Sequence, residues 1–114
     1  TALMCQQRMP ELNAGLQAAG LPMIITGTGI AAGSVILGQI GAHSGRKDFT
    51  LIGDAVNLAA RLESAAHFDK KPHILAADII MEKASALFQF SFHERLKVKG
   101  KQTAIDVFEL EKAL

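Results

Sequence analysis

The chain has one cysteine and neither tryptophan nor tyrosine among its 114 residues. A single cysteine, Cys5, cannot form an internal disulfide and cannot build a cysteine-based metal site. Phenylalanine, with six copies, is the only large aromatic residue, which leaves little for stacking on nucleic-acid bases. We therefore expect a reducing, intracellular setting and no nucleic-acid partner.

The chain also lacks a large excess of charge of one sign and lacks long uninterrupted apolar runs. The net charge is +1, so no overall basic field favours binding to a polyanion. The uncharged stretch 12–45 is interrupted by glycines, and residues 1–20 carry several polar side chains; both features argue against a signal peptide or a membrane span. A hydrophobic fraction of 49% excludes a disordered tail. We expect this segment to be cytoplasmic and to make no contact with a membrane. Whether a parent protein has a membrane anchor elsewhere stays an open question.

Hydrophobic spacing and turn residues predict mixed helices and strands, and hence an α+β fold. The predicted elements are a helix over 2–19 that contains Pro10 and stops at Gly20, a strand over 23–31, a strand over 48–53, a helix behind the N-cap Asp54, a strand over 74–77, a helix from the N-cap Asp78 to about Lys83, and an antiparallel pair of 88–99 with 103–110. The stretch 32–45 is glycine-rich and ambiguous, and 34–37 fits either a strand or a helical turn. The glycines within 23–31 mark places where another backbone approaches closely.

Asn57 and Arg61 are the strongest candidates for binding residues. They are four positions apart, so they project from the same face of the predicted helix. Asn57 falls in its first turn, where free N–H groups and the positive end of the helix dipole attract anions. An amide beside a guanidinium suits a polyphosphate or ribose ligand, and Thr50 adds a hydroxyl on the preceding strand.

A purely structural interpretation competes with this one. In that case Arg61 pairs with Glu63 or Asp54, and Asn57 only helps to cap the helix. A similar choice concerns four cations that alternate along one predicted strand and form either a phosphate-facing strip or a protected sheet edge: Arg95, Lys97, Lys99 and Lys101. The four histidines have no metal-ligand spacing, and we expect all of them to lie at the surface or to be paired: His43, His67, His73 and His93.

The run Phe-Thr-Leu-Ile-Gly-Asp-Ala-Val-Asn-Leu-Ala-Ala-Arg-Leu-Glu at 49–63 resembles the signature of class III adenylate/guanylate cyclase catalytic domains. Gly-Ile-Ala-Ala-Gly at 29–33 and Gly-Gln-Ile-Gly at 38–41 are similar to that family's Gly-Ile-x-x-Gly and Gly-x-Ile-Gly segments. Val-Lys-Gly-Lys at 98–101 and Val-Phe-Glu-Leu at 107–110 resemble its closing segments. The pieces keep the family's order and cover nearly the whole chain. The resemblance implies a partial ferredoxin-like cyclase fold, a mixed sheet with flanking helices.

The resemblance also implies roles for individual residues. Cyclases of this class are head-to-tail dimers whose active sites lie between subunits, and they use Mg²⁺ or Mn²⁺ to convert ATP, or GTP, into a 3′,5′-cyclic monophosphate and pyrophosphate. Asn57 matches the asparagine that orients the ribose, and Arg61 the arginine that stabilises charge on the α-phosphate. Lys99 matches a lysine that contacts the terminal phosphates. Thr50 occupies the purine-selecting position, where threonine resembles class IIIb; guanylate cyclase is the alternative.

The same resemblance implies that the first half of the catalytic domain is absent from this sequence. The family's first half carries two metal-binding aspartates, one in a Phe-x-Asp-Ile-x-x-Phe-Thr motif and one in a Gly-Asp hairpin, and neither motif is evident here. We therefore expect 1–114 to be the C-terminal portion of a single cyclase catalytic domain, with no metal site and no activity of its own. Asp54 follows a glycine but belongs to the Asn57 helix. The alternative is a non-catalytic cyclase-like module that dimerises and senses nucleotide.

Overall fold

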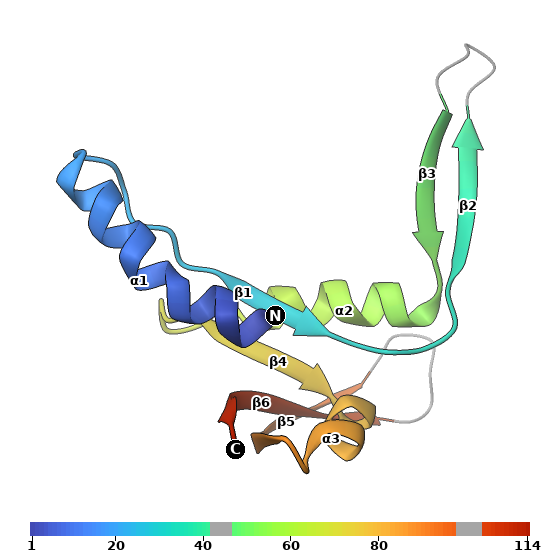
Figure 1. Cartoon of the computed structure of the whole chain (residues 1–114). Helices are drawn as coiled ribbons and strands as arrows, with labels where there is room; N and C mark the ends of the chain where they lie inside the picture. The colour runs from blue at the N-terminus through green and yellow to red at the C-terminus, as the bar shows by residue number, and fades with distance from the viewer. Residues whose placement is uncertain (42–46, 98–103) are drawn as a thin grey trace.

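The computed structural model describes residues 1–41, 47–97 and 104–114, with the backbone alone at 39–41 and 47–50. Its elements are, in chain order, α1 (Ala2–Ala18), β1 (Gly27–Ile30), β2 (Ile36–Gly41), β3 (Lys47–Ile52), α2 (Asp54–Ala65), β4 (His73–Ala77), α3 (Asp78–Ala84), β5 (Phe88–Lys97) and β6 (Ala104–Ala113) (Figure 1). The expected α+β class is confirmed.

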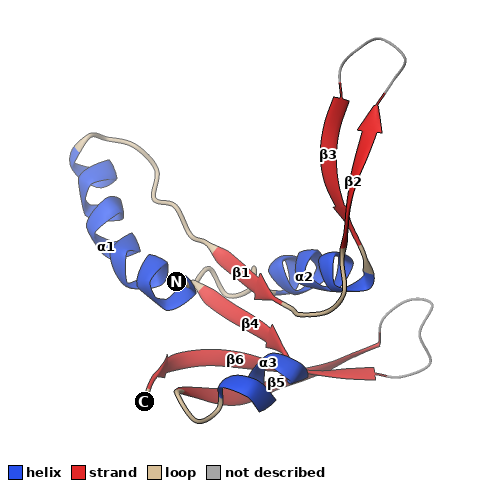
Figure 2. Ribbon diagram, turned by 45° about the vertical axis from the view of Figure 1, so that its right-hand side comes forward, coloured by secondary structure: helices blue, strands red, loops and turns tan. Residues whose placement is uncertain are grey.

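A four-stranded mixed sheet in the order β1-β4-β6-β5 forms the body of the chain. β1 and β4 are parallel, and the connection between them includes α2. β6 runs antiparallel to both β4 and β5, as the sequence predicts for the last two strands. β2 and β3 pair only with each other in an arm that projects away from the sheet (Figures 1 and 2). The ambiguous stretch before β3 therefore contains a strand at Ile36–Gly41.

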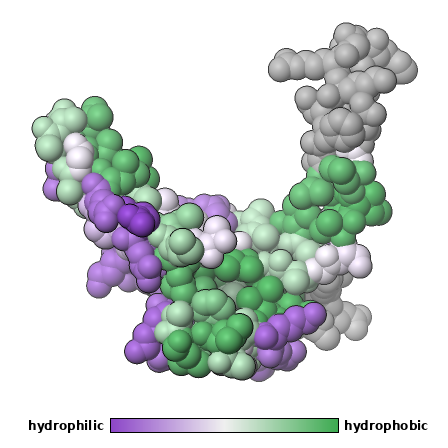
Figure 3. Space-filling model, viewed as in Figure 1, coloured by the Kyte–Doolittle hydropathy of each residue, from purple (hydrophilic) through white to green (hydrophobic). Residues whose placement is uncertain are grey.

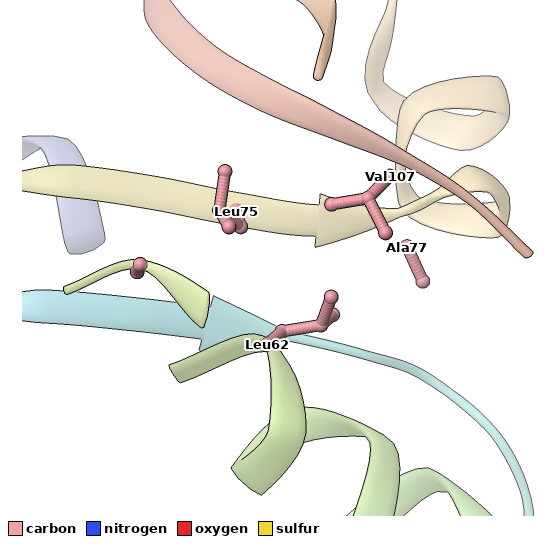
Figure 4. Close-up of a cluster of buried hydrophobic side chains, with 5 residues drawn as sticks. Leu62, Leu75, Ala77 and Val107 are labelled. Atoms are coloured by element: carbon pink, nitrogen blue, oxygen red, sulfur yellow. The ribbon is translucent and has the colours of Figure 1, made fainter. Parts of the chain in front are cut away.

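The core lies between α2 and one face of the sheet. Leu62 of α2 is fully buried and packs in a cluster with Leu75 and Ala77 of β4 and Val107 of β6 (Figure 4). Ala66, just beyond α2, completes the cluster. Burial of each leucine contributes about 2 kcal/mol, so this cluster seats α2 on the sheet.

α1 packs loosely, since none of its residues is buried. It runs unbroken through Pro10 and ends where the sequence predicts. Gly20 has a φ of +75°, its N–H donates to the Gln17 carbonyl at 3.0 Å, and the next N–H donates to Leu16 at 2.8 Å. Only glycine adopts that backbone conformation freely, which explains the stop.

Three predicted boundaries are wrong. The strand predicted over 23–31 is only β1, because the N–H and carbonyl of Ile24 bond to the side chain of Asn13 at 2.8 and 2.9 Å instead of joining the sheet. Gly53 and Ala77, not Asp54 and Asp78, are the N-cap residues. Both aspartates are the first residues of their helices, where a carboxylate still interacts favourably with the helix dipole.

Candidate functional site

The helix that carries the candidate residues lies unusually close to β1. A Cβ at Gly29 would stand 2.3 Å from the Ala59 carbonyl oxygen and 2.5 Å from the Glu63 nitrogen, both backbone atoms of α2. At Gly27 the nearest atom, the Ala66 Cβ, would be 3.0 Å away. The prediction that these glycines admit another backbone is confirmed for Gly29, whereas the atoms nearest to Gly27 belong to side chains. Because of them, α2 has a fixed position over the sheet.

Asn57 and Arg61 lie on α2 and are both exposed. The opposite side of the helix is held down by Leu62, which has no exposed surface. Within the described residues, neither side chain makes a hydrogen bond or an ion pair. Glu63, one suggested partner of Arg61, bonds to His67 instead. An amide and a guanidinium thus project to solvent from one turn of a rigid helix, available for a ligand.

The start of α2 differs from the expectation in one respect. The N–H groups of Val56 and Asn57 donate to the Gly53 carbonyl at 3.2 and 3.3 Å, so the backbone of Asn57 is not free to bind an anion. Only its side chain remains as a donor. A Cβ at Gly53 would lie 2.8 Å from the Ser34 carbonyl oxygen, which explains why glycine stands at this turn.

The two other predicted residues have different outcomes. Thr50 lies on β3 opposite Gly38 of β2, a few residues before α2, and its side chain is outside the described part of the structure. Lys99 falls in 98–103, which lie outside the described residues altogether. The proximity of Thr50 and Lys99 to Asn57 and Arg61 thus stays a prediction.

Of the four alternating cations, the structure describes Arg95 and Lys97. They lie on β5, the edge strand of the sheet. Arg95 donates to Asp106 of β6 at 2.8 Å, and this bond raises the pKa of its guanidinium. A paired arginine is unsuited to a phosphate-facing strip, so the described part of the strand favours the sheet-edge interpretation.

Three of the four histidines are described, and all three have partners. His67 bonds to Glu63, and His93 stacks on Phe68 with 5.0 Å between ring centroids. His73 donates to Glu109 at 2.5 Å and to Asp69 at 2.7 Å. His43 lies outside the described residues. The expectation of paired or surface histidines holds for the described three.

His73 has a perturbed pKa. Burial lowers the pKa of the ring, but the hydrogen bonds to Glu109 and Asp69 outweigh burial and raise it above the ordinary 6.5. The bond from His73 likewise lowers the pKa of Asp69. Sequence spacing gives no sign of this cluster, because Glu109 comes from β6, 36 positions away.

The described residues do not fit a divalent metal ion. They contain no group of three or more histidine, cysteine, aspartate or glutamate side chains arranged to hold one. Within the same part of the chain, no helix is long and apolar enough to span a membrane. A pocket of about 500 Å³ lies between α1 and 23–26, and it includes neither Asn57 nor Arg61.

Comparison of the sequence with known proteins identifies a family. Residues 9–111 match the adenylate and guanylate cyclase catalytic domain. Adenylate cyclase 1 of Rhizobium meliloti (strain 1021) is 33% identical over 109 residues, which are 96% of this chain and 16% of that protein. The adenylate cyclase of Anabaena cylindrica is 36% identical over 117 residues, covering 96% of this chain and 23% of the relative. The chain thus spans less than a quarter of either relative.

Solved structures give the same result for the fold. The guanylyl cyclase Cya2 superposes with a TM-score of 0.78 at 24% identity, covering 95% of this chain and 53% of that one. The fold of this chain therefore matches about half of that solved chain. With the match over residues 9–111, the chain belongs to the adenylate and guanylate cyclase catalytic domain family.

Proposed function

We propose that this chain contributes to a nucleotidyl cyclase that converts ATP into 3′,5′-cyclic AMP and pyrophosphate. The observation that carries the proposal is the exposed Asn57–Arg61 pair, unbonded among the described residues and fixed on a helix that Gly29 and Leu62 seat on the sheet. A guanidinium held in place stabilises charge that develops on a phosphate without reorganising during the reaction. In this proposal Asn57 orients the ribose and Arg61 stabilises the α-phosphate as the 3′-oxygen attacks.

The preference for ATP over GTP is part of the same proposal. Two relatives with more than 30% identity are named adenylate cyclases. Thr50 would contact the purine, with a hydroxyl that both donates and accepts a hydrogen bond. Lys99 would bind the terminal phosphates as a point charge. A nucleoside triphosphate substrate also suits a cytoplasmic location.

We propose further that residues 1–114 are the C-terminal portion of one catalytic domain. In support, the chain covers 53% of the solved guanylyl cyclase chain. Mg²⁺ or Mn²⁺ supplies charge neutralisation at the phosphates in such reactions. Since the described residues do not fit this ion, its ligands would come from outside them, and 1–114 alone would be inactive.

The arm formed by β2 and β3 supports a homodimer. Ile36 faces Ile52 across the two strands, and Leu37 faces Leu51. All four are more than half exposed, at 69%, 51%, 66% and 52%, and the lower part of the arm is hydrophobic in Figure 3. A two-stranded ribbon that is apolar on both faces is marginal in water, so we propose that a second copy covers it.

Replacing Leu37 and Leu51 with serine should weaken self-association of a catalytic domain that contains this chain by tenfold or more, because each buried leucine contributes about 2 kcal/mol. Sedimentation equilibrium measures the dissociation constant. Leu87→Ser is the control, since Leu87 is 68% exposed and lies outside the arm. An unchanged dissociation constant in the double variant would argue against an arm-mediated dimer.

The proposed reaction is tested in a catalytic domain that includes this chain and both metal-binding aspartates. The domain is incubated with Mn²⁺ and either ATP or GTP, and the products are separated chromatographically. Cyclic AMP from ATP, with little cyclic GMP from GTP, is the expected result. Cyclic GMP as the main product would make it a guanylate cyclase. No product from either nucleotide in a folded dimer would favour the non-catalytic nucleotide-sensing module.

A further inference from the structure

The loop that follows α2 contacts two histidines of the sheet, His73 of β4 and His93 of β5, and His73 also bonds to the loop's Asp69. Residues 66–72 connect α2 to β4, and His73 is the first residue of β4 (Figure 2). The Nδ1–H of His73 donates to Glu109 of β6 at 2.5 Å, and Nε2–H donates to Asp69 of the loop at 2.7 Å. Phe68 stacks on the imidazole with 3.8 Å between centroids and 14° between planes. The His73 side chain is only 11% exposed.

This arrangement requires a protonated ring. A neutral imidazole carries one N–H and can donate to only one of the two carboxylates, whereas the imidazolium donates to both. Loss of the proton from His73 would turn a ring lone pair toward Asp69 or Glu109. Because charge-assisted bonds are roughly twice as strong as neutral ones, the connection through His73 would then be weaker.

Other ionisable groups lie on the loop and on the elements next to it. They are Glu63 and His67 at the end of α2, Lys70 and Lys71 in the loop, and His93 with Glu94 on β5. Glu63 is bonded to His67, and Glu94 is 3.8 Å from His93. Lys71 favours the charged form of Asp69 and so lowers the pKa of that carboxyl. The lowered pKa keeps Asp69 a carboxylate, which favours a proton on His73.

We propose that protonated His73 is a latch that fastens the loop after α2 to β6, and that the loop detaches when His73 loses its proton. Phe68 and Asp69 follow closely after Ala65, the last residue of α2, so release of the latch loosens the C-terminal end of that helix. The consequence for Asn57 and Arg61, a turnover that falls as the pH rises, rests on the proposed function.

The direction of the pH effect follows from the two pKa shifts. The pKa of His73 is raised in the folded chain, so the stability that the latch contributes is complete below the ordinary value of 6.5 and is lost as the pH rises through the raised pKa. The pKa of Asp69 is lowered, so its contribution is lost only as the pH falls through that low value.

Exchange of the backbone amide hydrogens of residues 66–71 in the full chain tests the latch without any assay of activity. After correction for intrinsic exchange rates, protection should fall by tenfold or more as the pH passes the His73 titration. That titration, followed by NMR at the Cε1 proton, should have its midpoint above 6.5. His73→Gln should abolish the step in protection, while His67→Gln, which removes only the pair with Glu63, should retain it.

If His73→Gln does not fold, Asp69→Asn replaces it. The Asp69 side chain is 45% exposed, and loss of its charge should move the step to lower pH. Protection that is independent of pH in the unaltered chain, or a step that His73→Gln retains, would overturn the latch. In an active catalytic domain, kcat should fall through the same pH. If the loop opens as the pH rises but kcat does not change, the link between the latch and turnover is overturned. Absence of product at every pH would count against the proposed function alone.

Discussion

Replacement of Gly29 by alanine should lower the free energy of unfolding by about 3 kcal/mol, the upper part of the range for an overpacked site. The added methyl would stand 2.3 Å from the Ala59 carbonyl oxygen and 2.9 Å from the Leu62 Cβ. Since the closest atoms belong to the α2 backbone, no side-chain rotation relieves the contact. α2 has to move away from β1, and Leu62 then loses part of its burial. Urea unfolding followed by circular dichroism measures the change.

Gly15→Ala is the matched control, because it makes the same substitution where the structure has room. A Cβ at Gly15 would have no atom within 4 Å, and the residue lies inside α1. Alanine in a helix interior is favoured over glycine by roughly 0.5–1 kcal/mol. This variant should therefore be as stable as the parent or slightly more stable. Equal destabilisation by both substitutions would contradict the proposed close contact at Gly29.

Arg61→Ala in the complete catalytic domain should reduce kcat by on the order of 10²-fold, with the unfolding transition unchanged. The guanidinium is exposed and has no partner in the described part of the chain, so its removal leaves no buried group unsatisfied. Its proposed role is to stabilise charge that exists only in the transition state, and such a loss appears in kcat. Steady-state kinetics with Mn²⁺–ATP give kcat and KM separately.

Arg8→Ala controls for the loss of a surface arginine. Arg8 lies on α1 with its side chain 77% exposed, and its ion pair is an exposed one with Glu11 at 3.5 Å. Such a pair contributes at most about 1 kcal/mol, so kcat should stay within twofold of the parent. An Arg61→Ala domain that turns over as fast as Arg8→Ala would remove Arg61 from the proposed mechanism.

Much of the fold could be predicted because its signals are local. The Gly20 stop of α1, the placement of α2 and the antiparallel β5–β6 pair depend on periodicity and turn residues, and the structure contains all three. The strand predicted over 23–31 was too long because the side chain of Asn13, 11 positions earlier on α1, takes the backbone groups of Ile24. The pattern within 23–31 gives no sign of that competitor.

The sequence by itself determined which residues share the face of α2, since a spacing of four places Asn57 and Arg61 one turn apart on any helix. It also determined the family, through motifs that keep their order along the chain. The spacing of four also allows Glu63 to pair with His67, and the structure shows that pair, which leaves Arg61 without a described partner. Only the tertiary structure decided that Glu109 of β6 meets His73, 36 positions away in the chain. Contacts between residues far apart in sequence depend on how strands pair and helices pack, and neither is encoded in local spacing.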